Sequence, residues 1–189
     1  MTSDHDRLLG GLRILDAGQV LAGPVVGALL GDMGAEVIKL EMPQLVGEDR
    51  AQKNSTRSLE YRNKKSITLD LRTPGAVDVV KRLVAVSDAM IENYSPGRME
   101  KWGIGFDALQ EANPRIILVS ISGFGQTGPY RDRTSYDRIG QAMGGAIYVT
   151  GEAGEPPVHP GYMFGDYVSG TFGALAILAL VLADRLPAP

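Results

Sequence analysis

Short apolar runs rich in β-branched residues alternate with stretches of helical periodicity over the first 121 residues, and this alternation limits the possible folds more than any other feature. We expect strands at residues 12–15, 36–40, 66–69, 89–91 and 116–121. Helices are expected at residues 25–33, 76–86 and 106–112. Parallel strands need a crossover connection, usually a helix, so the pattern predicts an α/β fold: a mostly parallel sheet with helices on both faces.

The pattern changes after the fifth expected strand. A loop rich in Gly, Pro and Arg (residues 123–134) leads to a helix expected near residues 136–147. A second Gly/Pro loop (151–161) leads to a long apolar helix that begins near Asp166. Residues 167–183 carry no charge, a length at the lower edge of what can span a bilayer. A buried helix of a soluble α/β protein has the same composition, and we expect that rather than membrane insertion.

Composition excludes several classes of protein. The chain contains no cysteine, which excludes disulfides, thiolate metal sites and a cysteine nucleophile. Its 19 Lys and Arg against 22 Asp and Glu give a formal charge of −3, with no overall bias toward nucleic acid. Residues 1–9 are polar rather than apolar as in a secretory signal, so we expect a cytoplasmic protein.

One segment is strongly basic. Residues 50–65 contain one acid, Glu60, and the following six bases: Arg50, Lys53, Arg57, Arg62, Lys64 and Lys65. The segment is either a solvated loop or a patch for a phosphorylated ligand, because Lys and Arg supply charge and donors to phosphate oxygens. It lies between two expected strands, which suits the rim of a parallel sheet where ligands bind.

Three sequence patterns argue against a dinucleotide site, a metal site and a serine triad. Residues 123–128 satisfy G-x-G-x-x-G, but a dinucleotide site needs a helix to open at once, and Pro129 and Tyr130 follow instead. We therefore expect a glycine loop and no NAD. His5 and His159 have no partner at metal-ligand spacing, so no metal site is expected. No G-x-S-x-G motif is present for a serine triad.

Asp166 has two interpretations. It follows a Pro/Gly loop and precedes an apolar helix, which is the place of an N-cap aspartate. The same place on a partly desolvated rim suits a carboxylate that attacks an activated acyl group. In that case the flanking glycines, Gly161 and Gly165, would let backbone N–H groups approach an oxyanion. The residues by themselves leave both interpretations open.

Several blocks, taken in order and spacing, carry a resemblance to a known family. They are residues 15–16 (LD), 22–24 (AGP), 30–41 (LGDMGAEVIKLE), 63–70 (NKKSITLD), 92–97 (ENYSPG), 113–117 (NPRII), 123–125 (GFG), 136–137 (YD) and 165–166 (GD). Together they resemble the class III (CaiB/BaiF-type) CoA-transferases over about residues 8–185. The resemblance implies the Rossmann-like, large-domain portion of that fold.

The resemblance also implies a reaction and a set of site residues. The enzyme would move CoA from an acyl-CoA thioester to a carboxylic acid, without metal or NAD. Asp166 would be the nucleophile, forming an aspartyl-acyl anhydride and then an aspartyl-CoA thioester. CoA would be bound by Gln19, Val20, Leu21, Ala22, Asn93, Tyr94 and Lys101, with Lys64 and Lys65 as further candidates for its phosphates.

Two features of the chain, the residue at position 136 and the length, bear on alternatives to a complete transferase. The 2-methylacyl-CoA racemases of the same fold carry a histidine beside the aspartate that matches Asp137, where this chain has Tyr136; tyrosine is a poor base at pH 7. Family members are about twice as long, so residues 1–189 would be the CoA-binding, catalytic α/β portion, with the second domain absent. We therefore expect a homodimer or association with a second chain, and a non-catalytic CoA-binding subunit of a split enzyme remains an alternative.

Overall fold

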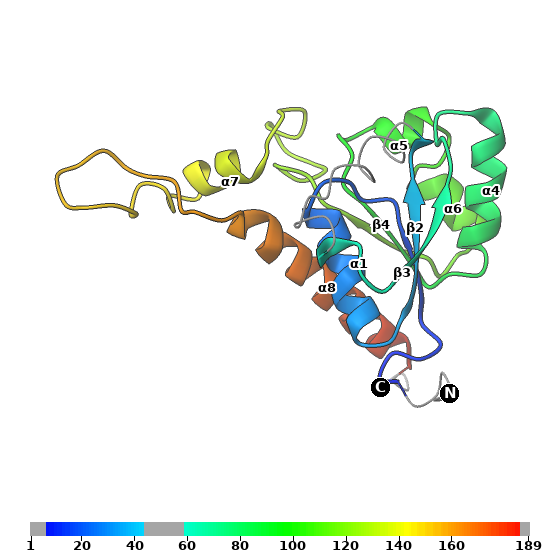
Figure 1. Ribbon diagram of the computed structural model, residues 1–189. Coiled ribbons are helices and arrows are strands. Elements are labelled where there is room, and N and C mark those ends of the chain that lie inside the picture. The colour runs from blue at the N-terminus through cyan, green and yellow to red at the C-terminus, as the bar shows by residue number, and fades with distance from the viewer. Residues whose placement is uncertain (1–6, 44–58, 186–189) are drawn as a thin grey trace.

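A computed structural model describes residues 7–43 and 59–185, which form one five-stranded parallel sheet in the order β3-β2-β1-β4-β5 (Figure 1). The strands are β1 (Arg13–Asp16), β2 (Glu36–Glu41), β3 (Lys64–Thr68), β4 (Ala89–Glu92) and β5 (Ile117–Ser120). The helices are α1 (Ala22–Asp32), α4 (Pro74–Val84), α5 (Arg98–Lys101), α6 (Phe106–Ala112), α7 (Asp137–Met143) and α8 (Phe164–Arg185). The predicted fold class is confirmed.

The sheet has a core on each face because successive side chains of a strand point to opposite sides. Ile14 of β1 faces the cluster formed with α1 and α8, which includes Leu30 and Ile177. Leu15, the next residue, faces the cluster formed with α4, α5 and α6, which includes Leu109. The prediction of helices on both faces is therefore confirmed.

The order of the strands creates a crevice beside β1. From β1 the chain builds β2 and β3 on one side and then crosses to build β4 and β5 on the other. In the β1–β4 pair, Asp16 lies opposite Ile91, so both strands end at the same edge of the sheet. In open parallel sheets ligands bind at such a switch point, outside the carboxyl ends of the strands.

The boundaries of the expected elements are close to the observed ones, with two differences. The four-residue helix α5 was missed, since a single turn is too short to show a helical period. Helix α7 ends at Met143 rather than at residue 147. Gly144 and Gly145 follow it, and Gly145 has a left-handed backbone (φ +81°) that favours helix termination.

Helix α8 is long and apolar enough to cross a membrane by length and composition, and 22% of its most apolar 18-residue window is buried. One face packs on α1, where a Cβ on Gly170 would lie 2.8 Å from the Ala22 carbonyl oxygen. Small residues therefore let the two helices approach closely. The opposite face exposes Phe172 and Leu182. The expected core helix is thus covered on one face only within the described part of the chain.

The segment between α7 and α8, residues 144–163, extends away from the sheet before it returns to α8 (Figure 1). Several of its larger side chains are exposed, including Tyr148, Val149 and Tyr162. We call this segment the arm.

Candidate active site

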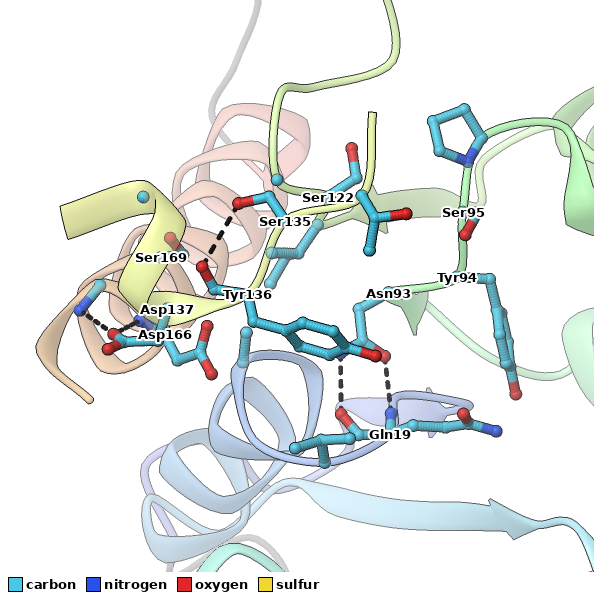
Figure 2. A pocket seen from close by; sticks show the side chains of 18 of the residues that line it. Gln19, Asn93, Tyr94, Ser95, Ser122, Ser135, Tyr136, Asp137, Asp166 and Ser169 are labelled. Carbon is cyan, nitrogen blue, oxygen red and sulfur yellow. Dashed lines mark hydrogen bonds between the residues drawn. The ribbon is translucent and has the colours of Figure 1, made fainter. Parts of the chain in front are cut away.

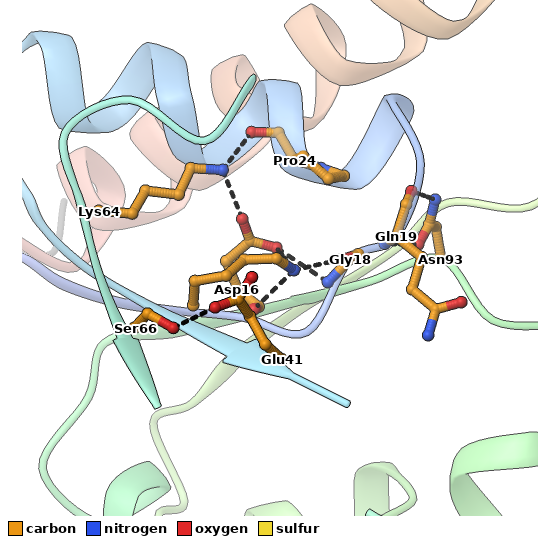
Figure 3. Close-up of polar contacts among 9 residues, drawn as sticks. Asp16, Gly18, Gln19, Pro24, Glu41, Lys64, Ser66 and Asn93 are labelled. Atoms are coloured by element: carbon orange, nitrogen blue, oxygen red, sulfur yellow. Dashed lines mark hydrogen bonds and ion pairs between the residues drawn. The ribbon is translucent and has the colours of Figure 1, made fainter. Parts of the chain in front are cut away.

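A buried group of charges fixes the loop that leaves β1 (Figure 3). The Asp16 carboxylate, at the end of the strand, lies 3.2 Å from the Lys39 ammonium and 2.6 Å from the Lys64 ammonium. Both lysines also donate to backbone carbonyls of the loop and of the following helix: Lys39 to that of Gly18, and Lys64 to that of Pro24 at 2.6 Å. The network ties three strands to the path of residues 17–24.

Burial and ion pairing shift the pKa values of Asp16 and Lys64 in opposite directions. Burial would raise the pKa of Asp16, but the two ammonium groups hold it below its usual range. Burial lowers the pKa of Lys64, and the Asp16 carboxylate opposes this only in part. The two lysines expected near phosphates are thus engaged elsewhere: Lys64 in the core, and Lys65 in a surface ion pair with Glu36.

Asn93, just past the end of β4, bridges the crevice to the β1 loop. Its side-chain oxygen accepts from the Gln19 N–H at 2.6 Å, and its amide donates to the Gln19 carbonyl at 2.8 Å. Val20, which follows Gln19 in the loop, has φ +59°, an unusual backbone conformation for a β-branched residue. Strain of this kind persists where the surroundings over-determine it, and it concentrates at functional sites.

A cavity of about 450 Å³ opens at this crevice. It is lined by the β1–α1 loop, the start of the β4–α5 connection, the segment after β5 and the first turns of α7 and α8. The structure brings together here the predicted residues Gln19, Val20, Leu21, Ala22, Asn93, Tyr94 and Asp166. Lys64, Lys65 and Lys101 do not line the cavity, and their expected role remains a prediction. Asp137 also lines the cavity. Figure 2 shows the Tyr136 ring between the carboxylates of Asp137 and Asp166 on one side and Asn93 on the other.

Three arginines that the sequence did not single out also line the cavity: Arg98, Arg131 and Arg133. Arg98 lies in α5, the helix whose period was too short to detect. The other two lie in a loop of mixed charge that gives no pattern of its own. They add positive charge to the lining of a cavity that also holds a carboxylate.

Asp166 is not the N-cap of α8, since it is the third residue of the helix. The first turn is instead capped from outside by Asp137, the first residue of α7. One oxygen of Asp137 accepts from the Gly165 N–H at 2.8 Å and from the Asp166 N–H at 3.3 Å. The Gly165 N–H is therefore already hydrogen-bonded to Asp137. It does not point to an oxyanion site, in contrast to the nucleophile interpretation of the sequence. The contact brings two carboxylates close together.

Burial, and then the negative charge of Asp137, raise the pKa of Asp166 to about 6. Asp166 is therefore mostly ionised at pH 7 but loses its charge under mildly acidic conditions. A half-buried, partly desolvated carboxylate is a stronger nucleophile than one in bulk water. Perturbed carboxyl groups in a cleft are typical of active sites.

The position of His159 was not predicted from sequence. His159 lies at the end of the arm, 22 positions after Asp137, yet its Nε2 is 3.6 Å from an Asp137 oxygen. Gln141 of α7 donates to the same oxygen at 2.5 Å. No local spacing indicates this group, because the excursion of the arm determines which residues return to α7.

The glycine motif at residues 123–128 forms a loop with no helix directly after it, as expected. A Cβ on Gly123 would lie 2.0 Å from the Ser135 Cβ, so the loop folds back on the segment that leads to α7. Glycine is required there for close backbone packing. This packing accounts for the first glycine without a dinucleotide.

The fold and the cavity define an α/β protein with a cavity at the switch point of a parallel sheet, and that cavity carries a half-buried carboxylate. The chain belongs to the CoA-transferase family III, which it matches over residues 9–186. This agrees with the resemblance noted in the sequence.

Known relatives show the same kinship. The chain is 46% identical over 187 residues to the succinyl-CoA–D-citramalate CoA-transferase of Chloroflexus aurantiacus, covering 95% of this chain and 46% of the relative. It is 42% identical to the beta subunit of the succinyl-CoA–L-malate CoA-transferase of the same organism, covering 94% and 45%. A CaiB/BaiF family protein from Brucella suis has a solved structure with a TM-score of 0.83 and 37% identity, covering 92% and 48%. The chain thus spans about half the length of the relatives it matches.

Proposed function

We propose that this chain is the CoA-binding and nucleophile-bearing portion of a CoA-transferase that moves CoA from an acyl-CoA thioester to a carboxylic acid. The observation that carries the proposal is Asp166, a half-buried carboxylate in the cavity at the switch point. Membership of the family and similarity to two CoA-transferases support it. The second domain that the resemblance implies, and the activity of a longer protein, are part of the proposal.

In the proposed reaction an ionised oxygen of Asp166 attacks the thioester carbonyl carbon. The carbon–sulfur bond breaks, CoA leaves as a thiolate, and an aspartyl-acyl anhydride remains. The thiolate then attacks the Asp166 carbonyl carbon, which releases the donor acid and leaves an aspartyl-CoA thioester. The acceptor carboxylate attacks the carbonyl carbon of that thioester, its carbon–sulfur bond breaks, and a second anhydride joins Asp166 to the acceptor. The released thiolate then attacks the acceptor's acyl carbon, which forms the new acyl-CoA and frees the Asp166 carboxylate. The raised pKa of Asp166 supports this role, because ionisation is still largely complete at pH 7.

CoA would lie along the β1–α1 loop and across the crevice toward Tyr94. Asn93 contributes by holding Gln19 on both sides of its backbone. Arg98, Arg131 and Arg133 would pair with phosphate or carboxylate oxygens, since guanidinium groups recognise both.

We propose dicarboxylic acids as the substrate class. The two transferases above are named for citramalate and malate, which have two carboxyl groups, and for succinyl-CoA, which keeps one free carboxyl group beside its thioester. One carboxyl group carries the reaction and the other needs a cation. The three arginines that line the cavity are candidates for that cation.

Intact mass spectrometry after incubation with succinyl-CoA tests the nucleophile. We expect a covalent CoA adduct in the unaltered chain and none in Asp166→Ala. Asp78→Ala in α4 is the control, because Asp78 is exposed and does not line the cavity; this variant should form the adduct. An adduct that survives Asp166→Ala would show that another group is the nucleophile.

A non-catalytic CoA-binding subunit is the second candidate, favoured by the half-length match to relatives named as alpha and beta subunits. Calorimetric titration with CoA distinguishes the two. Binding without any adduct, alone or with a partner chain, would favour the subunit. Binding with an adduct lost in Asp166→Ala favours the transferase.

Association with a second chain, identical or different, is also proposed. The exposed apolar face of α8 and the extended arm support it, because contiguous exposed apolar surface on a soluble protein marks an interaction site. Sedimentation velocity over a range of concentrations would show a monomer if this is wrong. A cytoplasmic location remains a prediction.

A further inference from the structure

His159 occupies an unusual place beside the proposed nucleophile. Its Nε2 is shielded from solvent, has no hydrogen-bond partner among the described residues, and lies 3.6 Å from an oxygen of Asp137. The Asp137 side chain is almost fully buried, with 4% of its surface exposed. A buried polar atom without a partner in a native fold calls for an explanation.

The two carboxylate oxygens of Asp137 make different contacts. One oxygen accepts the N–H groups of Gly165 and Asp166 and so fixes the first turn of α8. The other accepts the Gln141 amide and faces His159. The Gln141 amide also donates to the Tyr162 carbonyl at 3.2 Å, which sets its orientation. The orientation of Asp137 therefore determines how Asp166 is presented to the cavity.

Charge around Asp166 is uneven. After burial, the Asp137 carboxylate is the group that raises the pKa of Asp166. From the loop before α7, Arg131, Arg133 and Tyr136 line the same cavity. On α8 itself, the Tyr167 hydroxyl donates to Glu60. The cation closest to the Asp137 carboxylate among the described ion pairs is His159 when protonated.

We propose that His159 is a positioning residue for the nucleophile. Its imidazole faces the Asp137 oxygen that also accepts the Gln141 amide. There it holds the carboxylate in place as the cap of α8 and offsets the negative charge that Asp137 presents to Asp166. A protonated imidazole supplies a positive charge that an uncharged polar side chain in its place would not. The inference rests on the proposed function in that it assigns Asp166 as the reacting group.

The test measures the pH at which Asp166 ionises, by carbon-13 NMR titration of aspartate carboxyl groups, with Asp166→Asn to assign the signal. His159→Gln keeps a polar side chain but removes the charge. We expect its Asp166 titration to move to higher pH by about 0.5 to 1 pH unit. His159→Lys restores a cation and should return the titration most of the way. Val158→Ala, at the exposed neighbouring position, is the matched control and should leave it unchanged.

A titration in His159→Gln that superimposes on that of the unaltered chain, or that moves to lower pH, overturns the proposal. The measurement needs a folded chain but no turnover, so it gives an answer even if the transferase proposal fails. Where the CoA adduct forms, the acidic limb of its rate against pH should move by the same amount in His159→Gln. A purely structural role would lower the rate at every pH and leave the midpoint of that limb in place.

Discussion

Replacing Asp166 by asparagine should make the protein more stable, and only above mildly acidic pH. The folded-state pKa of about 6 lies above the ordinary value of 3.8, so the folded protein favours the protonated form. Below about pH 3 the carboxyl is protonated in both the folded and the unfolded chain, and it costs nothing. As the pH rises toward 6 the unfolded chain ionises first, and the folded state is penalised by a growing amount that becomes constant above about pH 7.

The pKa difference corresponds to about 3 kcal/mol at full burial, and we expect about 1–2 kcal/mol because Asp166 is half-buried and screened by solvent. Urea unfolding followed by the fluorescence of Trp102, the one tryptophan in the sequence, measures the difference at about pH 3 and pH 8. Asp132→Asn, at a largely exposed position, is the control and should change nothing. A gain of the same size at both pH values, or none at pH 8, would refute the reasoning.

Three further changes test the framework of the site. Asp16→Ala leaves two buried ammonium groups without their carboxylate and should lower the free energy of unfolding by about 3–5 kcal/mol in urea titrations. Gly170→Ala should cost about 1–2 kcal/mol in the same assay, because its Cβ would press on α1, whereas Gly140→Ala in α7 meets nothing within 4 Å and should be neutral or stabilising. Asn93→Ala removes both bonds to Gln19 and should weaken CoA binding about tenfold by calorimetry; unchanged affinity would remove this residue from the site.

The sheet could be predicted from sequence because its signals are local. The run at residues 36–40 contains the β-branched Val37 and Ile38, and the helix-length gap before it favours a parallel crossover. The strand ends then indicated a ligand edge, and the family resemblance identified Gln19 and Asn93 there. Both line the cavity.

The rest depends on which distant residues meet. Lys64 is an ordinary basic residue in the sequence, and its burial against Asp16 follows from the register of β3 on β2 and from the passage of α1 above them. The contact between His159 and Asp137 follows from the return of the arm. Neither has a periodic or spacing signal, so sequence reasoning could not locate them.

The buried charges under the β1–α1 loop have a consequence for ligand affinity. Holding a loop of five residues in one shape costs conformational entropy, and a flexible loop incurs that cost each time a ligand binds. Here Lys39 and Lys64 bind the backbone on both sides of Gln19, and this ordering is achieved once, when the chain folds. A molecule that enters the cavity therefore meets a preorganised wall, and more of its contact energy is retained as affinity.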